Sequence, residues 1–213
     1  MDRRRRSLLA ALALAPLAAR AQQPVSGTDY SVLRPEMPVE TQGKIEVIEF
    51  FWYGCPSCYR LEPLLEAWLP KLPPDAQFRR IPAVFDDPRW QRDALIYYTF
   101  EALGVIAKLH RPLFDAIHRS RLRTEDKLAL AEWLQRSGVD PKRFDEAQNS
   151  FGVQSRVRRA AQLTASYRLE GVPTLAVQGR YTIKVEQAKT YEGMLATADH
   201  LIGLARKALA ASK

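Results

Sequence analysis

The sequence predicts an α/β fold in which an all-helical block interrupts a domain built around a sheet. Three observations support this prediction. A strand, a helix and a second strand follow one another between residues 44 and 81. Between residues 86 and 167, apolar residues recur almost only at helical spacing. Strand patterns return at Thr174 and a long helix follows. We therefore expect residues 22–85 and 168–213 to form the sheet-containing domain and residues 86–167 to form an inserted helical domain.

The N-terminal segment has the pattern of a secretory signal peptide. Residues 3–6 are arginines, residues 7–19 are mostly apolar, and a small-x-small cleavage site precedes Gln22. These 13 residues are too few for a membrane-spanning helix, which needs ~20. We therefore predict that residues 1–21 are removed on export to the bacterial periplasm.

The charge of the remaining chain gives no indication of a nucleic-acid partner. Residues 22–213 hold 27 basic and 23 acidic side chains, a formal charge of +4 rather than the +8 of the whole chain. Such a value is ordinary for a folded domain, and we predict no nucleic-acid partner.

The first half of the sheet comes from the segment before the helical block. Residues 22–43 are polar and proline-containing, so we expect an extended lead-in with one short edge strand near residues 30–33. Residues 44–52 form a β-branched and aromatic run, typical of a strand buried on both faces. The helix after it closes at Leu69-Pro70, and residues 76–81 predict a second strand joined by a right-handed crossover.

The helical block is predicted from repeated apolar spacing. Residues 90–109 form one helix or two, with Gly104 as the weak point. We expect Pro112 to restart the chain and Thr124 to cap the next helix. Another helix runs from Val153 onward.

The last part of the chain returns to the sheet. Residues 174–177 and 180–184 flank the two-residue link Gln178-Gly179, which is typical of a hairpin. From Tyr191 to Leu209, apolar residues are spaced alternately four and three apart. This stripe predicts a helix that lies on the sheet.

Two cysteines stand where the first buried strand gives way to a helix. Cys55 and Cys58 are three residues apart, and Pro56 suits the first turn of a helix. A thiol at a helix N-terminus faces unpaired N–H groups and the positive end of the macrodipole, so its thiolate is favoured. We expect Cys55 to be exposed and attacked, and Cys58 to be covered and resolving. A disulfide whose reduced form is stabilised in this way is an oxidant.

Two other interpretations of the cysteines are weaker. A structural disulfide usually joins residues far apart in sequence. A zinc site needs four ligands, and the remaining candidates, His110, His118 and His200, are not in ligand spacing. We predict no metal and no separate cofactor, with the Cys55–Cys58 disulfide as the redox group.

The order of these elements resembles the thioredoxin fold with a helical insertion, and in particular the DsbA family of periplasmic thiol:disulfide oxidoreductases. Four stretches carry the resemblance: GTDYSVL (27–33), EFFWYGCPSCY (49–59), NSFGVQSRV (149–157) and EGVPTLAVQGRYTI (170–183). A CxxC motif followed about 115 residues later by Gly-Val-Pro is a specific combination.

The resemblance implies roles for several further residues. Val172 and Pro173 would form a cis-proline loop facing the disulfide, where the backbone of Val172 pairs with an extended substrate. Glu49, a carboxylate inside an apolar strand, would lie beneath the active site and aid proton transfer to and from Cys58. Its implied partner on the next strand is Arg80. A charge at the edge of the strand is the alternative interpretation of Glu49.

The motif departs from the family at one position. The family usually has Cys-Pro-His-Cys, and here position 57 is serine. We expect Pro56 and Ser57 to modulate the motif and Cys55 to be a milder oxidant. Its pKa should lie below the free value of about 8.5 but above the lower end of the roughly 3.5–7.5 range of activated thiols.

The function predicted from these features is that of an enzyme, a protein dithiol:disulfide oxidoreductase. It would donate the Cys55–Cys58 disulfide to exported, unfolded polypeptides with free cysteines, through a mixed disulfide on Cys55. The resemblance implies reoxidation by a DsbB-like, quinone-linked membrane protein, and we expect a monomer. The alternatives are a disulfide reductase or isomerase of the same fold, and a thiol-based metal carrier or chaperone.

Overall fold

A single mixed sheet forms the centre of the molecule. The computed structural model describes residues 23–41 and 43–211, so the predicted signal peptide lies outside the described residues. The sheet has the strand order β1-β5-β4-β2-β3. Its strands are β1 (Ser31–Val32), β2 (Ile45–Phe51), β3 (Ala76–Pro82), β4 (Thr174–Val177) and β5 (Tyr181–Lys184). β2 pairs parallel with β3 and antiparallel with β4, so it has a hydrogen-bonded neighbour on each side.

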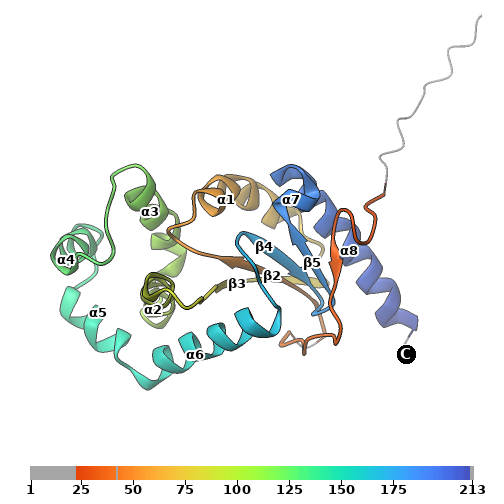
Figure 1. Ribbon diagram of the computed structural model, residues 1–213. Coiled ribbons are helices and arrows are strands. Elements are labelled where there is room, and N and C mark those ends of the chain that lie inside the picture. The colour runs from red at the N-terminus through yellow and green to blue at the C-terminus, as the bar shows by residue number, and fades with distance from the viewer. Residues whose placement is uncertain (1–22, 42, 212–213) are drawn as a thin grey trace, which may run out of the picture.

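The helices divide into two groups around the sheet (Figure 1). One group contains α1 (Pro56–Trp68), α7 (Val185–Ala188) and α8 (Tyr191–Ala211); α8 packs on β4 and β5, α7 packs on β5, and α1 packs on α8. Five helices lie between β3 and β4 in the chain: α2 (Pro88–Ala102), α3 (Ile106–His118), α4 (Lys127–Arg136), α5 (Pro141–Gln148) and α6 (Phe151–Ser166). All five helices lie within residues 86–167, the range predicted for the inserted domain. That these residues form a separate domain remains a prediction.

Both faces of β2 are covered, as its apolar run predicts. All of its residues are buried. Ile45 and Val47 pack into the cluster that contains the apolar side of α8. Ile48 and Phe50 point the other way, and the Phe50 ring lies 4.9 Å from the ring of Tyr167 at the end of α6. The active-site cysteines therefore follow a strand that is held from both sides.

The predicted break at Pro112 is wrong. The chain does break at Gly104, which has a φ of +70° and separates α2 from α3. Pro112, however, lies inside α3. Its ring removes one backbone hydrogen bond, but Leu109 and Leu113 on the same helix are fully buried, and their packing offsets that loss.

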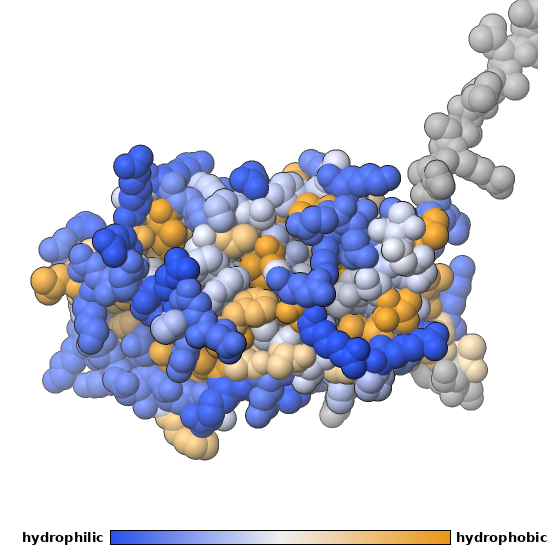
Figure 2. Space-filling model, in the orientation of Figure 1, coloured by the Kyte–Doolittle hydropathy of each residue, from blue (hydrophilic) through white to orange (hydrophobic). Residues whose placement is uncertain are grey.

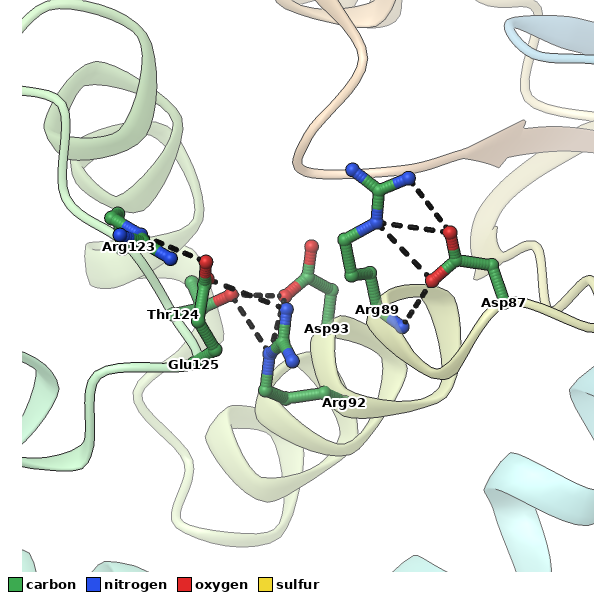
Figure 3. Close-up of polar contacts among 7 residues, drawn as sticks. All are labelled: Asp87, Arg89, Arg92, Asp93, Arg123, Thr124 and Glu125. Atoms are coloured by element: carbon green, nitrogen blue, oxygen red, sulfur yellow. Dashed lines mark hydrogen bonds and ion pairs between the residues drawn. The ribbon is translucent and has the colours of Figure 1, made fainter.

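The predicted helix cap at Thr124 is also wrong. Asp126 caps α4 by accepting from two backbone N–H groups at 3.1 Å. The Thr124 hydroxyl is instead buried against α2, where it donates to Asp93 at 2.7 Å and accepts from Arg92 at 3.1 Å (Figure 3). Thr124 therefore links the segment before α4 to α2 by hydrogen bonds, and Asp126, adjacent to the helix, is its N-cap residue.

The C-terminal elements agree closely with the sequence pattern. The hairpin link has three residues, 178–180, rather than the two predicted. α8 packs against β2, β4 and β5, which confirms the predicted stripe, although Leu209 at its end is 43% exposed.

The outer surface is mixed in character. Figure 2 shows hydrophilic residues over most of one face, with apolar residues in separate groups. Among the described residues, no helix is long and apolar enough to cross a membrane.

The turn between β4 and β5 generates a test of the fold. Gly179 has a φ of +61°, and a Cβ at this position would lie 2.1 Å from the carbonyl oxygen of Met37. We expect Gly179→Ala to lower the free energy of unfolding by about 2–3 kcal/mol, because the alanine must adopt a left-handed conformation and displace the 34–39 segment. Urea denaturation measures the change. Gly203→Ala, inside α8 with nothing within 4 Å, is the matched control and should be stabilising by about 0.5–1 kcal/mol. Equal effects of the two substitutions would contradict this role for Gly179.

Candidate active site

The two cysteines lie at the start of α1, as predicted. Cys55 is the N-cap residue, with extended backbone (φ −87°), and Pro56 occupies the first turn. The backbone N–H of Cys58 donates to the Cys55 sulfur at 3.4 Å. Cys58 has no exposed surface, while Cys55 is partly exposed. The two sulfurs are not bonded to each other, so the structure shows the dithiol form.

This position separates the acidities of the two thiols. The pKa of Cys55 is lowered to about 6, first by the hydrogen bond from the Cys58 thiol and then by the backbone N–H groups of Cys58 and Ser57, against the opposing effect of burial. Burial raises the pKa of Cys58 well above its usual range. At neutral pH the dithiol form therefore carries a thiolate on Cys55 and a proton on Cys58.

A loop distant in the sequence lies against Cys55. The Val172–Pro173 peptide bond is cis, as the resemblance implies. The Cys55 sulfur lies 3.4 Å from the carbonyl oxygen of Val172, within hydrogen-bonding reach in the thiol form. A cleft of about 440 Å³ borders this loop and is lined in part by Pro173, Thr174 and Lys184. The partly exposed sulfur of Cys55 thus lies against the backbone of the cis-proline loop, and this loop also lines the cleft.

Glu49 and Arg80 meet beneath the cysteines. Glu49 on β2 is directly opposite Arg80 in the register with β3, and Arg80 Nε lies 3.0 Å from Glu49 Oε2. Glu49 is 0% exposed, so the alternative of a charge at the strand edge is wrong. Burial, together with the charge of Glu62, raises its pKa to about 8 against the opposing charge of Arg80. Glu49 therefore holds a proton at neutral pH.

Three further residues, none of them predicted from the sequence to lie here, extend this buried cluster. Arg80 Nη2 lies 3.1 Å from Glu62 Oε2, and Glu62 Oε1 lies 3.2 Å from His110 Nε2. His110 Nδ1 lies 2.9 Å from the hydroxyl of Tyr53. A signal was available for Glu62: it is four residues after Cys58, an acid within the buried stripe of α1.

Metal-ligand geometry is not found in this region. Within residues 23–41 and 43–211, no group of three or more His, Cys, Asp or Glu side chains is arranged to hold a metal ion.

Comparison with known proteins places these features in a family. Residues 46–197 match the family model described as DSBA-like thioredoxin domain. The thiol:disulfide interchange protein DsbA of Azotobacter vinelandii is 41% identical over 182 residues, covering 85% of each chain. That of Bordetella parapertussis is 42% identical, covering 93% of this chain and 94% of the relative.

Solved structures agree. The crystal structure of Pseudomonas aeruginosa DsbA aligns with a TM-score of 0.81 and 37% identity, covering 89% of this chain and 97% of that one. DsbA from Xylella fastidiosa aligns with a TM-score of 0.80 and 32% identity, covering 87% and 100%.

The chain belongs to the DSBA-like thioredoxin family. This confirms the resemblance predicted from the sequence and the thioredoxin fold with a helical insertion. It also confirms the predicted class of enzyme, a dithiol:disulfide oxidoreductase that forms disulfides.

This member of the family places an arginine beside its serine-containing motif. The Ser57 hydroxyl accepts from Arg60 Nη2 at 3.1 Å, and Arg60 Nε donates to the Tyr191 hydroxyl at 3.1 Å. The guanidinium is thereby held between α1 and α8 and contributes to lowering the pKa of Cys55. An arginine one turn into the helix thus supplies positive charge that Ser57 cannot.

We expect Arg60→Gln to raise the pKa of Cys55 by a few tenths of a unit, because an exposed charge contributes about 0.2–1 kcal/mol. The thiolate absorbance of the reduced protein, followed against pH, measures it. The shift should shrink in 1 M salt, because the Debye length falls to ~3 Å. Arg136→Gln, on the exposed side of α4, is the control and should leave the pKa unchanged. A Cys55 pKa that does not respond to Arg60→Gln at low salt would exclude this contribution.

Proposed function

We propose that this protein donates the Cys55–Cys58 disulfide to exported, unfolded polypeptides with free cysteines. The observation that carries the proposal is the position of the Cys55 sulfur. It lies at the N-terminus of α1, where its pKa falls to about 6, and 3.4 Å from the backbone carbonyl that precedes cis-Pro173. A low thiol pKa stabilises the dithiol product and so makes the disulfide a strong donor.

In the first step, a substrate thiolate attacks Cys55 and the Cys55–Cys58 bond breaks. The new bond is a mixed disulfide between the substrate sulfur and Cys55, and Cys58 leaves as a thiolate. Because the pKa of Cys58 is raised by burial, this thiolate takes up a proton. Glu49, which holds a proton at neutral pH and lies in the same buried region, is the proposed donor.

In the second step, another substrate thiolate attacks the substrate sulfur of the mixed disulfide. Cys55 then leaves as the thiolate that the helix N-terminus stabilises, and the substrate acquires its disulfide. The substrate has lost two electrons and the enzyme has gained them. The enzyme is left as the dithiol, the form that the structure shows.

The remaining site residues have positioning roles in this proposal. The backbone of Val172 pairs with the substrate chain in an extended conformation, and Pro173 shapes the loop that presents it. Pro56 begins α1 so that the N–H groups of Ser57 and Cys58 point at the sulfur. Arg80, which lies on the next strand 3.0 Å from Glu49, stabilises the Glu49 carboxylate once its proton has been given to Cys58.

The proposal extends to location and partners. The arginine-rich, then apolar N-terminal pattern supports export to the periplasm, an oxidising compartment. Turnover then requires removal of two electrons from the dithiol, and we assign this to a DsbB-like, quinone-linked membrane protein. We propose that the protein acts as a monomer, with the Cys55–Cys58 disulfide as its redox group and no separate cofactor.

Single-cysteine variants test the proposed order of events. We expect Cys58→Ser, with its Cys55 first converted to the mixed disulfide with glutathione, to exchange glutathione for an unfolded polypeptide that has a single cysteine. This second mixed disulfide should accumulate, because neither Cys58 nor a second substrate thiol is present to break it. Cys55→Ser should form none, because the remaining sulfur is buried. Non-reducing gel electrophoresis and mass spectrometry identify the bonded cysteine.

The wild-type protein provides the second half of this test. One equivalent of oxidised enzyme should introduce about one disulfide into the reduced polypeptide. If the oxidised enzyme leaves the reduced polypeptide unchanged and instead corrects a scrambled one, the protein is an isomerase and the proposal is wrong.

A further inference from the structure

The buried cluster beneath the cysteines holds two carboxyl groups but only one guanidinium. Arg80 lies 3.0 Å from Glu49 Oε2 and 3.1 Å from Glu62 Oε2, and both carboxyl groups are almost completely buried. Two ionised carboxylates in a region of low dielectric repel each other, and one guanidinium cannot neutralise both. The cluster therefore retains a proton at neutral pH, and this proton has two possible positions.

The hydrogen bonds of the two carboxyl groups are unequal. Both oxygens of Glu62 have a partner, Arg80 on one and His110 on the other. In contrast, Glu49 Oε1 is buried and has no hydrogen-bond partner among the residues that the structure describes. An unpartnered oxygen is far more costly on a carboxylate than on a neutral carboxyl group. This asymmetry favours the proton on Glu49.

The hydrogen-bonding of His110 gives the same assignment. Its ring lies among the rings of Phe51, Tyr97 and Phe114, and burial lowers its pKa, so the imidazole is neutral. If the Tyr53 hydroxyl donates to Nδ1, Nε2 carries the proton and donates to an ionised Glu62. The opposite tautomer requires a protonated Glu62 and leaves the Tyr53 hydroxyl proton without an acceptor. Only the first arrangement gives every proton on Tyr53 and His110 a partner.

The other charged groups near His110 are consistent with this arrangement. His110 and Glu62 line a cleft of about 480 Å³ together with Glu66, Arg111 and Arg80. Arg111 lies 3.7 Å from Glu66. The charge of Glu66 acts against the lowering of the His110 pKa, and the charge of Arg111 favours the ionised form of Glu62. Burial opposes ionisation of Glu62, but the hydrogen bond that His110 donates and the charge of Arg80 hold its pKa below the usual value.

We propose that His110 is a positioning residue that decides which buried carboxyl group carries the proton: by donating from Nε2 to Glu62 it keeps Glu62 ionised and places the proton on Glu49. The proton then lies on the side of Arg80 nearer the cysteines, where the charges of Glu49 and the two sulfurs influence one another. The contribution of a proton on Glu49 to disulfide exchange rests on the function proposed above. The location of that proton does not depend on the proposed function. Without His110, Glu62 takes the proton, Arg80 pairs fully with Glu49, and Glu49 ionises at lower pH.

The wild-type protein allows the first test. The reduced, full-length mature chain, labelled with ¹³C at glutamate carboxyl groups and ¹⁵N at histidine, is followed by NMR from pH 5 to 9. Glu49→Gln and Glu62→Gln assign the two carboxyl signals. We expect Glu49 to lose its proton near pH 8, Glu62 to be ionised at pH 7, and His110 to be neutral with its proton on Nε2. A protonated Glu62, or a proton on Nδ1 of His110, at pH 7 would overturn the proposal.

Substitutions of His110 supply the second test. We expect His110→Leu to lower the pKa of Glu49 by at least about one unit and to raise that of Glu62. His110→Gln keeps an N–H donor for Glu62 and should restore most of the wild-type titration. His200→Leu, on α8, is the control and should have no effect on either carboxyl group. If His110→Leu does not fold, His110→Met replaces it, and the wild-type titration is decisive in either case.

The outcomes separate this proposal from the proposed function. The titrations use no substrate, so an unchanged Glu49 in His110→Leu overturns the role of His110 even if the enzyme still donates disulfides. Conversely, a failure to donate disulfides leaves the position of the proton measurable. The slope of the reduction potential against pH should change near the pKa of Glu49. We expect this pH to be lower in His110→Leu than in the wild-type protein, and unchanged in His110→Gln.

Discussion

The hydrogen bonds that the start of α1 donates to the Cys55 sulfur are the interaction on which the rest of this site depends. A helix N-terminus presents N–H groups that have no partner within the helix, and here the N–H groups of Ser57 and Cys58 find one in that sulfur. The same helix turn buries Cys58. A single local geometry therefore produces one acidic, partly exposed thiol and one buried thiol that retains its proton, the combination that disulfide donation requires.

The sheet holds this geometry in place. β2 is paired on both sides and packed on both faces, so the chain leaves it at a defined point immediately before Cys55. β4 is paired to the same strand and begins directly after cis-Pro173, which places Val172 against the sulfur. Two segments 117 residues apart in the chain thus meet because their strands are neighbours.

Local patterns in the sequence were sufficient to predict much of the fold and the placement of the two cysteines. The apolar run of β2, the proline at the start of α1 and the spacing of α8 each arise from interactions within a few residues, and each was predicted. The pairing of Glu49 with Arg80, in contrast, was predicted from the family resemblance and not from local patterns in the sequence. His110 was missed for a different reason: Pro112 was interpreted as a break, so His110 was not placed on the buried face of a continuous helix. Its contact with Glu62 also joins residues 48 apart, which spacing alone does not reveal.

The central claim is that the dithiol is stabilised relative to the disulfide, and the equilibrium between the protein and glutathione at pH 7 tests it most directly. The account predicts a reduction potential well above the roughly −270 mV of thioredoxin, so that glutathione readily reduces the Cys55–Cys58 disulfide. A potential at or below about −270 mV would show that the Cys55 thiolate is not stabilised enough to drive donation, and would contradict the account.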